Sequence, residues 1–475
     1  MGKRSFAKNY AFNLFYQTVI IALPLVTTPY LSRVLGAEEI GKYSFAHSIV
    51  SYFSLAAALG STVYGQRLIA KESDREERTR LFFEVLLLRA MGVGAACLIY
   101  GFAVVPRSSS PLLYAVVALE ILNVAFDISW FFQGAEDLKP VALCTAISKL
   151  FAVAGIFIFV KEPQDLIVYV IIYCGAYVLG SALPWVLLPR YLSLKDRRWR
   201  GLRIGRHFLP ALSLFISQAA IQVYVVLDKT MIGVITGSDV ENGYYEQSQK
   251  LARVLVAIVT SLGVVMASRV AVLWKENKKS EVYSLIFDSF RFVFALGMPI
   301  AVGVPIVADR FVPIFYGEGF EPVAPLISVL AVMVLIIGCS NVVGIQLLVP
   351  TEREKLLTVS VVAGAVVNLF LNLWLIRLWG STGAAIASLA AELAVTGVQF
   401  FFVRREISVL KVLKILLRYL LYGGIMGAVG LGASRLASEG FWGFAIVVAS
   451  CAVTYGGLLL VTRDKALNVF RRRKI

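Results

Sequence analysis

The sequence is poor in charged residues and has no long polar segment. Only 16% of its 475 residues are Asp, Glu, Lys or Arg, whereas 59% are hydrophobic, and the mean hydropathy is +0.78. Soluble globular chains carry about one quarter charged residues. No polar stretch is long enough to build its own core, which excludes a soluble domain. Recurring apolar runs of about 20 residues instead predict a polytopic helical membrane protein.

Residues for metal and disulfide chemistry are also scarce. The two histidines, His47 and His207, lie far apart in the sequence, and the five cysteines form no CxxC pair. Each cysteine lies within an apolar run, where a small packing residue is expected. We therefore predict no metal site, no catalytic residue and no cofactor. A coupling ion, H⁺ or Na⁺, is the one small inorganic ligand that we keep as a candidate.

Nucleotide and nucleic-acid binding lack support as well. The stretch GAEEIGK at 36–42 nearly spells a phosphate-binding loop, but Tyr43 follows it in place of the Ser or Thr that would hold magnesium, and no strand precedes it. We predict no ATP binding. The net charge of +16 comes from Lys and Arg gathered in short segments between apolar runs, which is typical of membrane topology, so no nucleic acid is expected.

The apolar runs predict an all-α protein of about fourteen transmembrane helices. The predicted spans are 11–31, 43–64, 81–105, 112–132, 141–160, 166–188, 208–235, 251–273, 285–307, 326–349, 356–376, 384–403, 415–436 and 441–461. The first run is too long for a signal peptide. The basic segments 67–80, 190–206 and 404–418 alternate with short acidic loops, which predicts that both termini are cytoplasmic.

The seventh span, within VYVVLDKTMIGVI, places an acid and a base side by side. A charge at bilayer depth costs about 2.5–3.5 kcal/mol on insertion scales. Neighbours on a helix diverge by about 100°, so Asp228 and Lys229 should have different partners. Gln218 and Gln222 nearly align with Lys229, and Tyr224 aligns with Asp228. These two lines predict a broad polar face.

The fourth span carries Glu120, Asn123 and Asp127, whose spacings of three and four predict one helical face. That face is either packed against neighbouring helices or forms a wall of a water-filled cavity. Other charged residues lie deep within predicted spans, roughly 12 Å from the nearest end at 1.5 Å per residue. These deep residues are Arg89, Lys149 and Glu392.

Several stretches resemble a known family. These are NLFYQTVIIALPLVTTPYLSRVLGAEEIGKYSFA at 13–46, FDISWFFQGAEDLK at 126–139, LDKTMIG at 227–233 and NGYYEQSQK at 242–250. Together they resemble bacterial lipid-linked oligosaccharide flippases, the Wzx-type O-antigen and polysaccharide transporters. That family shares the MOP superfamily with multidrug (MATE) exporters and peptidoglycan-precursor flippases.

The resemblance implies a MATE-like arrangement of domains in the bacterial inner or plasma membrane. It implies an N-terminal six-helix bundle at 1–188, a basic cytoplasmic linker at 189–207, a second six-helix bundle at 208–403, and two additional helices with a basic tail at 404–475. It also implies a flippase that moves undecaprenyl-pyrophosphate-linked oligosaccharide to the outer leaflet by alternating access. O-antigen, capsule or exopolysaccharide synthesis would use the product, with glycan polymerase machinery as a candidate partner.

Site residues follow from this implied substrate and from the polar positions above. The predicted pyrophosphate-binding residues are Arg33, Arg89, Lys149 and Lys229, because a pyrophosphate in a low-dielectric cavity needs cations. The predicted glycan-binding residues are Asn123, Gln218, Gln222 and Tyr224. The predicted coupling or cavity acids are Glu120, Asp127, Asp228 and Glu392.

The sequence leaves two alternative functions to consider. A MATE-like cation-coupled exporter of drugs or other small molecules would favour an acidic cavity, but acidic and basic residues are about equally common within the spans, so the motifs decide. A membrane glycosyltransferase or polymerase would need a sizeable extramembrane loop, and none is predicted. We therefore expect a transporter and not an enzyme.

Overall fold

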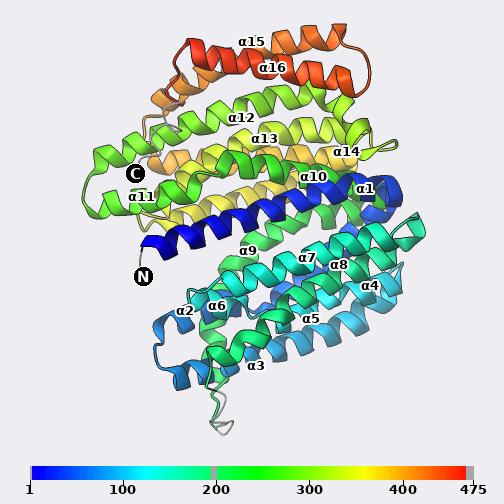
Figure 1. Cartoon of the computed structure of the whole chain (residues 1–475), viewed down its shortest axis with the longest axis vertical. Coiled ribbons are helices and arrows are strands. Elements are labelled where there is room, and N and C mark those ends of the chain that lie inside the picture. Colours follow the sequence, from blue (N-terminus) through cyan, green and yellow to red (C-terminus); the bar gives the residue numbers. More distant parts are fainter. Residues whose placement is uncertain (1–2, 194–200, 467–475) are drawn as a thin grey trace. The chain divides into compact units, whose positions relative to one another are not determined.

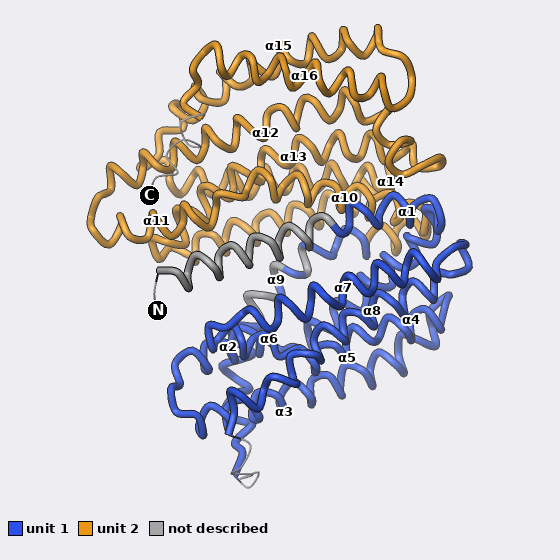
Figure 2. The backbone as a smooth tube through the Cα atoms, in the orientation of Figure 1, with its two compact units in different colours: residues 1–230 blue, residues 231–475 orange. Residues whose placement is uncertain are grey.

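The computed structural model describes residues 3–193 and 201–466, without the side chains of 3–22, 216–218, 220, 221, 223 and 224. Every regular element in those ranges is a helix, as predicted (Figure 1). The chain divides into two compact units, 1–230 and 231–475 (Figure 2). Their boundary falls within a helix and not in the predicted linker at 189–207. The four predicted domains stay a prediction.

Unit 1 is built from α1 to α8 and most of α9. Its elements are α1 (Lys3–Ala58), α2 (Ser61–Lys71), α3 (Arg75–Ile99), η1 (Tyr100–Val104), η2 (Val105–Arg107), α4 (Pro111–Val117), α5 (Leu119–Phe126), α6 (Ser129–Gly134), α7 (Lys139–Phe159), η3 (Pro163–Asp165), α8 (Leu166–Ala182), η4 (Leu183–Arg190) and α9 (Gly205–Thr236). Within this unit, α1 packs against α3, α5 and α7, and α8 packs against α5 and α7.

Unit 2 contains the end of α9 and all later helices. They are α10 (Asp239–Thr260), α11 (Gly263–Lys275), α12 (Lys279–Tyr316), α13 (Val323–Val343), η5 (Gly344–Leu348), α14 (Glu354–Val403), α15 (Val409–Leu436) and α16 (Phe441–Val461). Its core lies where α12 meets α13 and α15, and it contains the buried rings of Phe290, Phe294 and Tyr419. Gly423 and Gly427 let α15 approach α12 closely, because a Cβ on Gly423 would lie 2.8 Å from Met298.

Eleven helical segments of the described chain are long and apolar enough to cross a membrane. The predicted total of fourteen spans stays a prediction. Two elements each join parts of two predicted spans across a break at a glycine, although the span predicted at 43–64 runs past the end of α1 at Ala58 into α2. In α1 the break is at Gly36, with φ 74°. In α14 it is at Trp379 and Gly380, and the glycine has φ 53° and ψ −130°, where a side chain would be strained.

A carboxylate from α10 caps the helix segment that begins after the break in α14. Glu241 Oε2 accepts a hydrogen bond of 2.7 Å from the backbone N–H of Ser381, the first residue after Gly380. A free N–H at a helix start favours such an acceptor. A Cβ on Gly380 would lie 2.6 Å from the same carboxylate oxygen. The glycine therefore permits both the turn and the capping contact.

The aromatic residues of the motif Ser-Trp-Phe-Phe-Gln-Gly form the core that joins α2, α3 and α6. Trp130 is fully buried and stacks on Phe82 of α3, with ring centroids 5.5 Å apart. Gly65 of α2 faces the same indole, since a Cβ there would lie 2.5 Å from the Trp130 ring. This motif therefore packs the helices of unit 1, and it begins two residues after Asp127.

Candidate functional site

The deepest cation of unit 1 is Arg89 on α3, and it is held by neighbouring helices. Its side chain is 2% exposed. The guanidinium donates two hydrogen bonds, of 2.8 and 3.1 Å, to the Val124 carbonyl, and others to the hydroxyls of Ser61 (3.3 Å) and Thr62 (3.1 Å). It also lies 3.7 Å from a carboxylate oxygen of Asp127. With its donors satisfied, Arg89 serves in this conformation as a structural link between α2, α3 and α5.

The predicted single face of Glu120, Asn123 and Asp127 stays a prediction, but the helix that carries it ends before Asp127 and does not continue as one span. The preceding helix α5 ends at Phe126, and Asp127 has an extended backbone with ψ 104°. Its side chain accepts a hydrogen bond of 2.9 Å from the backbone N–H of Ser129 and so starts the turn into α6. The last carbonyls of α5 then need new donors. Arg89 supplies them for Val124, and the indole N–H of Trp185 donates to Phe126 at 2.7 Å.

Glu120, at the other end of α5, belongs to a separate cluster. A ring nitrogen of His47 on α1 lies 2.9 Å from its carboxylate. The Tyr43 hydroxyl donates to the same carboxylate at 3.4 Å, and the Cys174 thiol from α8 lies 3.8 Å away. Asn123 belongs to neither cluster: its side-chain oxygen is buried and has no hydrogen-bond partner in the described part of the chain.

Lys149 on α7 is a cation of a different kind. It is half-buried, and no hydrogen bond or ion pair joins its ammonium to any of the described residues. The neighbouring Ser148 is 3% exposed, and its hydroxyl likewise has no partner among them. An ammonium within an apolar helix is strongly disfavoured unless it meets water or an anion. The predicted role of Lys149 in binding an anion stays a prediction.

The acid and base of α9 are both buried, with 6% of Asp228 and 5% of Lys229 exposed, and both take part in polar contacts. The next residue, Thr230, fastens this part of α9 to α1. Its hydroxyl lies 3.0 Å from the Tyr52 hydroxyl and donates to Ser48 Oγ at 3.0 Å. The predicted substrate-binding lysine thus sits one residue from a hydrogen-bonded contact between α9 and α1.

The remaining predicted residues are spread over both units. Arg33 is exposed on α1 and donates to the Pro29 carbonyl at 2.9 Å. Gln222 is exposed on α9, and Glu392 is half-buried on α14 in unit 2. The side chains of Gln218 and Tyr224 lie outside the described residues. Each of these positions stays a predicted site.

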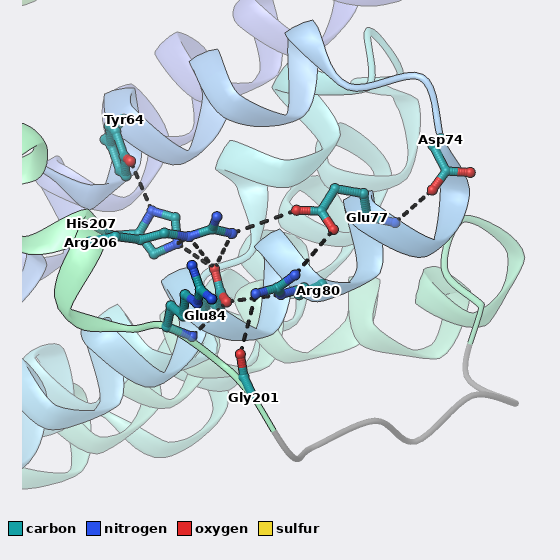
Figure 3. A network of polar contacts seen from close by, with 9 residues as sticks. Tyr64, Asp74, Glu77, Arg80, Glu84, Gly201, Arg206 and His207 are labelled. Carbon is teal, nitrogen blue, oxygen red and sulfur yellow. Dashed lines mark hydrogen bonds and ion pairs between the residues drawn. The ribbon is translucent and has the colours of Figure 1, made fainter.

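A further network, centred on Glu84, was not predicted as a site. Its fully buried carboxylate accepts hydrogen bonds from Arg206 (2.6 Å) and from the backbone N–H of Arg203 (2.7 Å), and a ring nitrogen of His207 lies 2.6 Å away (Figure 3). The other ring nitrogen of His207 meets the Tyr64 hydroxyl at 2.8 Å. The network ties the start of α9 to α2 and α3. The only signal in the sequence was a carboxylate near the start of a predicted span, 81–105.

These apolar helices, with charged side chains inside them, define a multi-pass membrane protein. A family model described as polysaccharide biosynthesis protein matches residues 6–272, more than half of the chain. The chain therefore belongs to the polysaccharide biosynthesis protein family, which confirms the family resemblance seen in the sequence.

The relatives agree with this assignment. The chain is 25% identical over 417 residues to a putative O-antigen transporter of Escherichia coli K12, covering 85% of this chain and 98% of the relative. The fold is similar to a lipid II flippase MurJ in an inward closed conformation, with a TM-score of 0.77, 14% identity, and 95% and 99% of the two chains covered. An inward-facing multidrug resistance MATE family transporter of the MOP superfamily gives a TM-score of 0.57 at 12% identity, with 83% and 99% covered.

Proposed function

We propose that this protein moves undecaprenyl-pyrophosphate-linked oligosaccharide from the inner to the outer leaflet of a bacterial inner or plasma membrane by alternating access. The product would be used for O-antigen, capsule or exopolysaccharide synthesis. The observation that carries this proposal is the alignment with the putative O-antigen transporter, which extends over nearly the whole of that relative. The MurJ-like fold supports it, because the same architecture serves a lipid-linked substrate there.

The anionic part of this substrate needs cations that are not already paired. Lys149 fits this need because its ammonium has no partner among the described residues. Lys229, on α9, and Arg33, at the end of the first half of α1, stay proposed cations of the site by their sequence positions, and both already take part in polar contacts. Arg89 acts indirectly in this scheme, since it links α2, α3 and α5.

The glycan and the driving ion need polar side chains of another type. Asn123 and Gln222 offer amides to sugar hydroxyls, and the unpartnered buried oxygen of Asn123 favours such a contact. Gln218 and Tyr224 stay assigned to the glycan by their sequence positions. Asp228 and Glu392 shape the electrostatic field. Glycan polymerase machinery would receive the product on the outer side.

The test is a leaflet-accessibility assay of an undecaprenyl-pyrophosphate-linked oligosaccharide in proteoliposomes. The wild-type protein should expose the glycan to an external glycan-modifying enzyme faster than protein-free vesicles do. Lys149→Ala should slow this exposure by about 10- to 100-fold, since a hydrogen bond to a charged group contributes about 1.5–3 kcal/mol. Lys149→Arg should keep part of the rate because the charge remains.

The matched control is Lys139→Ala, which removes an exposed lysine from the start of the same helix and should leave the rate unchanged. Equal rates in vesicles with and without the wild-type protein would contradict the flippase. Efflux of a cationic dye by the same vesicles, without glycan exposure, would instead support the MATE-like exporter.

A further inference from the structure

The first three turns of α15 carry three cations on one side of the helix. Lys411, Lys414 and Arg418 are spaced by three and four residues, which places them on one stripe. All three are exposed, whereas Val412 and Tyr419 point from the same turns into the core of unit 2. The charges therefore face away from the packed interior of the unit.

A second stripe of α15, next to the cations, is apolar and also exposed. It consists of Leu410, Leu413 and Leu417, which are 63%, 46% and 62% exposed. Each leucine directly precedes one of the cations, so the two stripes lie about 100° apart around the helix. Lipid tails are as apolar as leucine and can cover such a row. This surface thus offers a place for acyl chains beside a place for an anion.

The length of α15 places this surface at the edge of the hydrocarbon layer. Residues 419–434, between Arg418 and Arg435, contain no charged side chain. They span roughly 24 Å at 1.5 Å per residue, against about 30 Å for the hydrocarbon core of a bilayer. Lys411 and Lys414 lie up to about 10 Å beyond Arg418 along the helix. Long basic side chains at such a helix end reach the level of the lipid phosphates.

Carboxylates balance little of this charge. Arg418 has an acidic partner, because its guanidinium lies 3.7 Å from a carboxylate oxygen of Asp464. Within the described part of the chain, no carboxylate forms an ion pair with Lys411 or Lys414. The ammonium of Lys411 lies instead 5.8 Å from the centre of the Phe287 ring. Two of the three cations therefore lack an anion of the protein.

The segment that leads into α15 adds two more cations. Arg404 and Arg405 are both exposed, and the guanidinium of Arg404 lies 3.9 Å from the centre of the Phe401 ring. The acid of this segment, Glu406, is already bound, since Arg353 donates to both of its carboxylate oxygens, at 2.5 and 3.0 Å. The cations of residues 404–418 thus outnumber their acids, and an external anion can neutralise them.

We propose that this end of α15 binds the phosphate of an anionic phospholipid, whose acyl chains lie along the leucine stripe. Membrane topology needs basic residues close to a span, but it does not need them on one helix stripe beside exposed leucines. The bound lipid joins α15 to the segment before it and so stabilises the pair of helices α15 and α16, which pack against each other.

The test measures lipid binding to the detergent-purified full chain by native mass spectrometry. The wild type should bind one phosphatidylglycerol more tightly than phosphatidylcholine, whose headgroup has no net charge. Lys411→Gln/Lys414→Gln should weaken this binding by about 25-fold, at about fivefold for each cation. Lys411→Arg/Lys414→Arg should keep most of it because the charge remains. The matched control Arg269→Gln/Lys275→Gln removes two exposed cations of α11 and should bind as the wild type does.

A thermal shift gives a second measurement of the same site. Added phosphatidylglycerol should raise the melting temperatures of the wild type and of the arginine variant more than that of the glutamine variant. Equal binding of the two phospholipids, or an equal loss in the α11 control, would overturn the proposal. Displacement of phosphatidylglycerol by an equal concentration of inorganic phosphate or of undecaprenyl pyrophosphate would assign these cations to that ligand and would overturn it as well.

Discussion

Replacement of Arg89 is the sharpest test of how unit 1 is held together. Arg89→Met removes two hydrogen bonds to the Val124 carbonyl and those to Ser61 and Thr62 at a site that is 2% exposed. It also leaves Asp127 without its cation. That carboxylate is 28% exposed and lies 3.7 Å from the guanidinium, so this ion pair contributes little to the expected loss of stability. Breaking a buried charged contact from one side costs about 3–5 kcal/mol. We expect a loss of that size.

For a unit of 230 residues such a loss lowers the melting temperature by roughly 6–20 °C. The measurement is thermal unfolding in detergent, followed by tryptophan fluorescence, with membrane abundance recorded in parallel. Arg89→Lys keeps the charge but not the planar fork, so it should lose about 1–3 kcal/mol. Arg269→Met, an exposed arginine of α11, is the matched control. If the free energy of unfolding of Arg89→Met is within about 1 kcal/mol of that of the control, the guanidinium does not hold these helices together and the reasoning is refuted.

Three further substitutions test separate parts of the chain. Asp127→Asn should reduce glycan exposure while immunoblots show near-normal abundance, since the amide oxygen can still accept the hydrogen bond from the Ser129 N–H. Full activity would mean that Asp127 has only a structural role. Gly380→Ala should lower the free energy of unfolding by about 1–3 kcal/mol, and with it the melting temperature, because φ is 53° and the new Cβ would meet Glu241. An unchanged melting curve would contradict this backbone strain. Lys229→Ala should abolish glycan exposure with the fold intact and Lys229→Arg should keep part of it; equal losses would mean that shape and not charge matters.

The helices could be predicted from the sequence because apolar runs of span length have few other solutions in a membrane. The positions of the two glycine breaks could also be predicted, since Gly36 and Gly380 both lie between predicted spans. The break at Asp127 was missed, because apolar spacing runs straight through it. Its signal was local: an Asp two residues before a Ser is typical of a turn in which the carboxylate binds the backbone.

Less of the candidate site than of the fold could be predicted from the sequence. The depth of Arg89 was predicted, but its main acceptor exists only because α5 ends and leaves the Val124 carbonyl free. His47 and Glu120 are 73 residues apart, and hydropathy does not say which faces of two helices meet. Buried partners of this kind depend on packing between helices, which sequence spacing within one helix cannot give.

The placement of the unit boundary inside α9 has a mechanical consequence. Residues 205–230 of this helix count with unit 1 and residues 231–236 with unit 2, so no flexible linker separates the two at this point. The start of α9 is clamped by Glu84, and Thr230 is fastened to α1. One unbroken helix therefore joins the two units, and both attachments that hold it lie on the unit 1 side of the boundary.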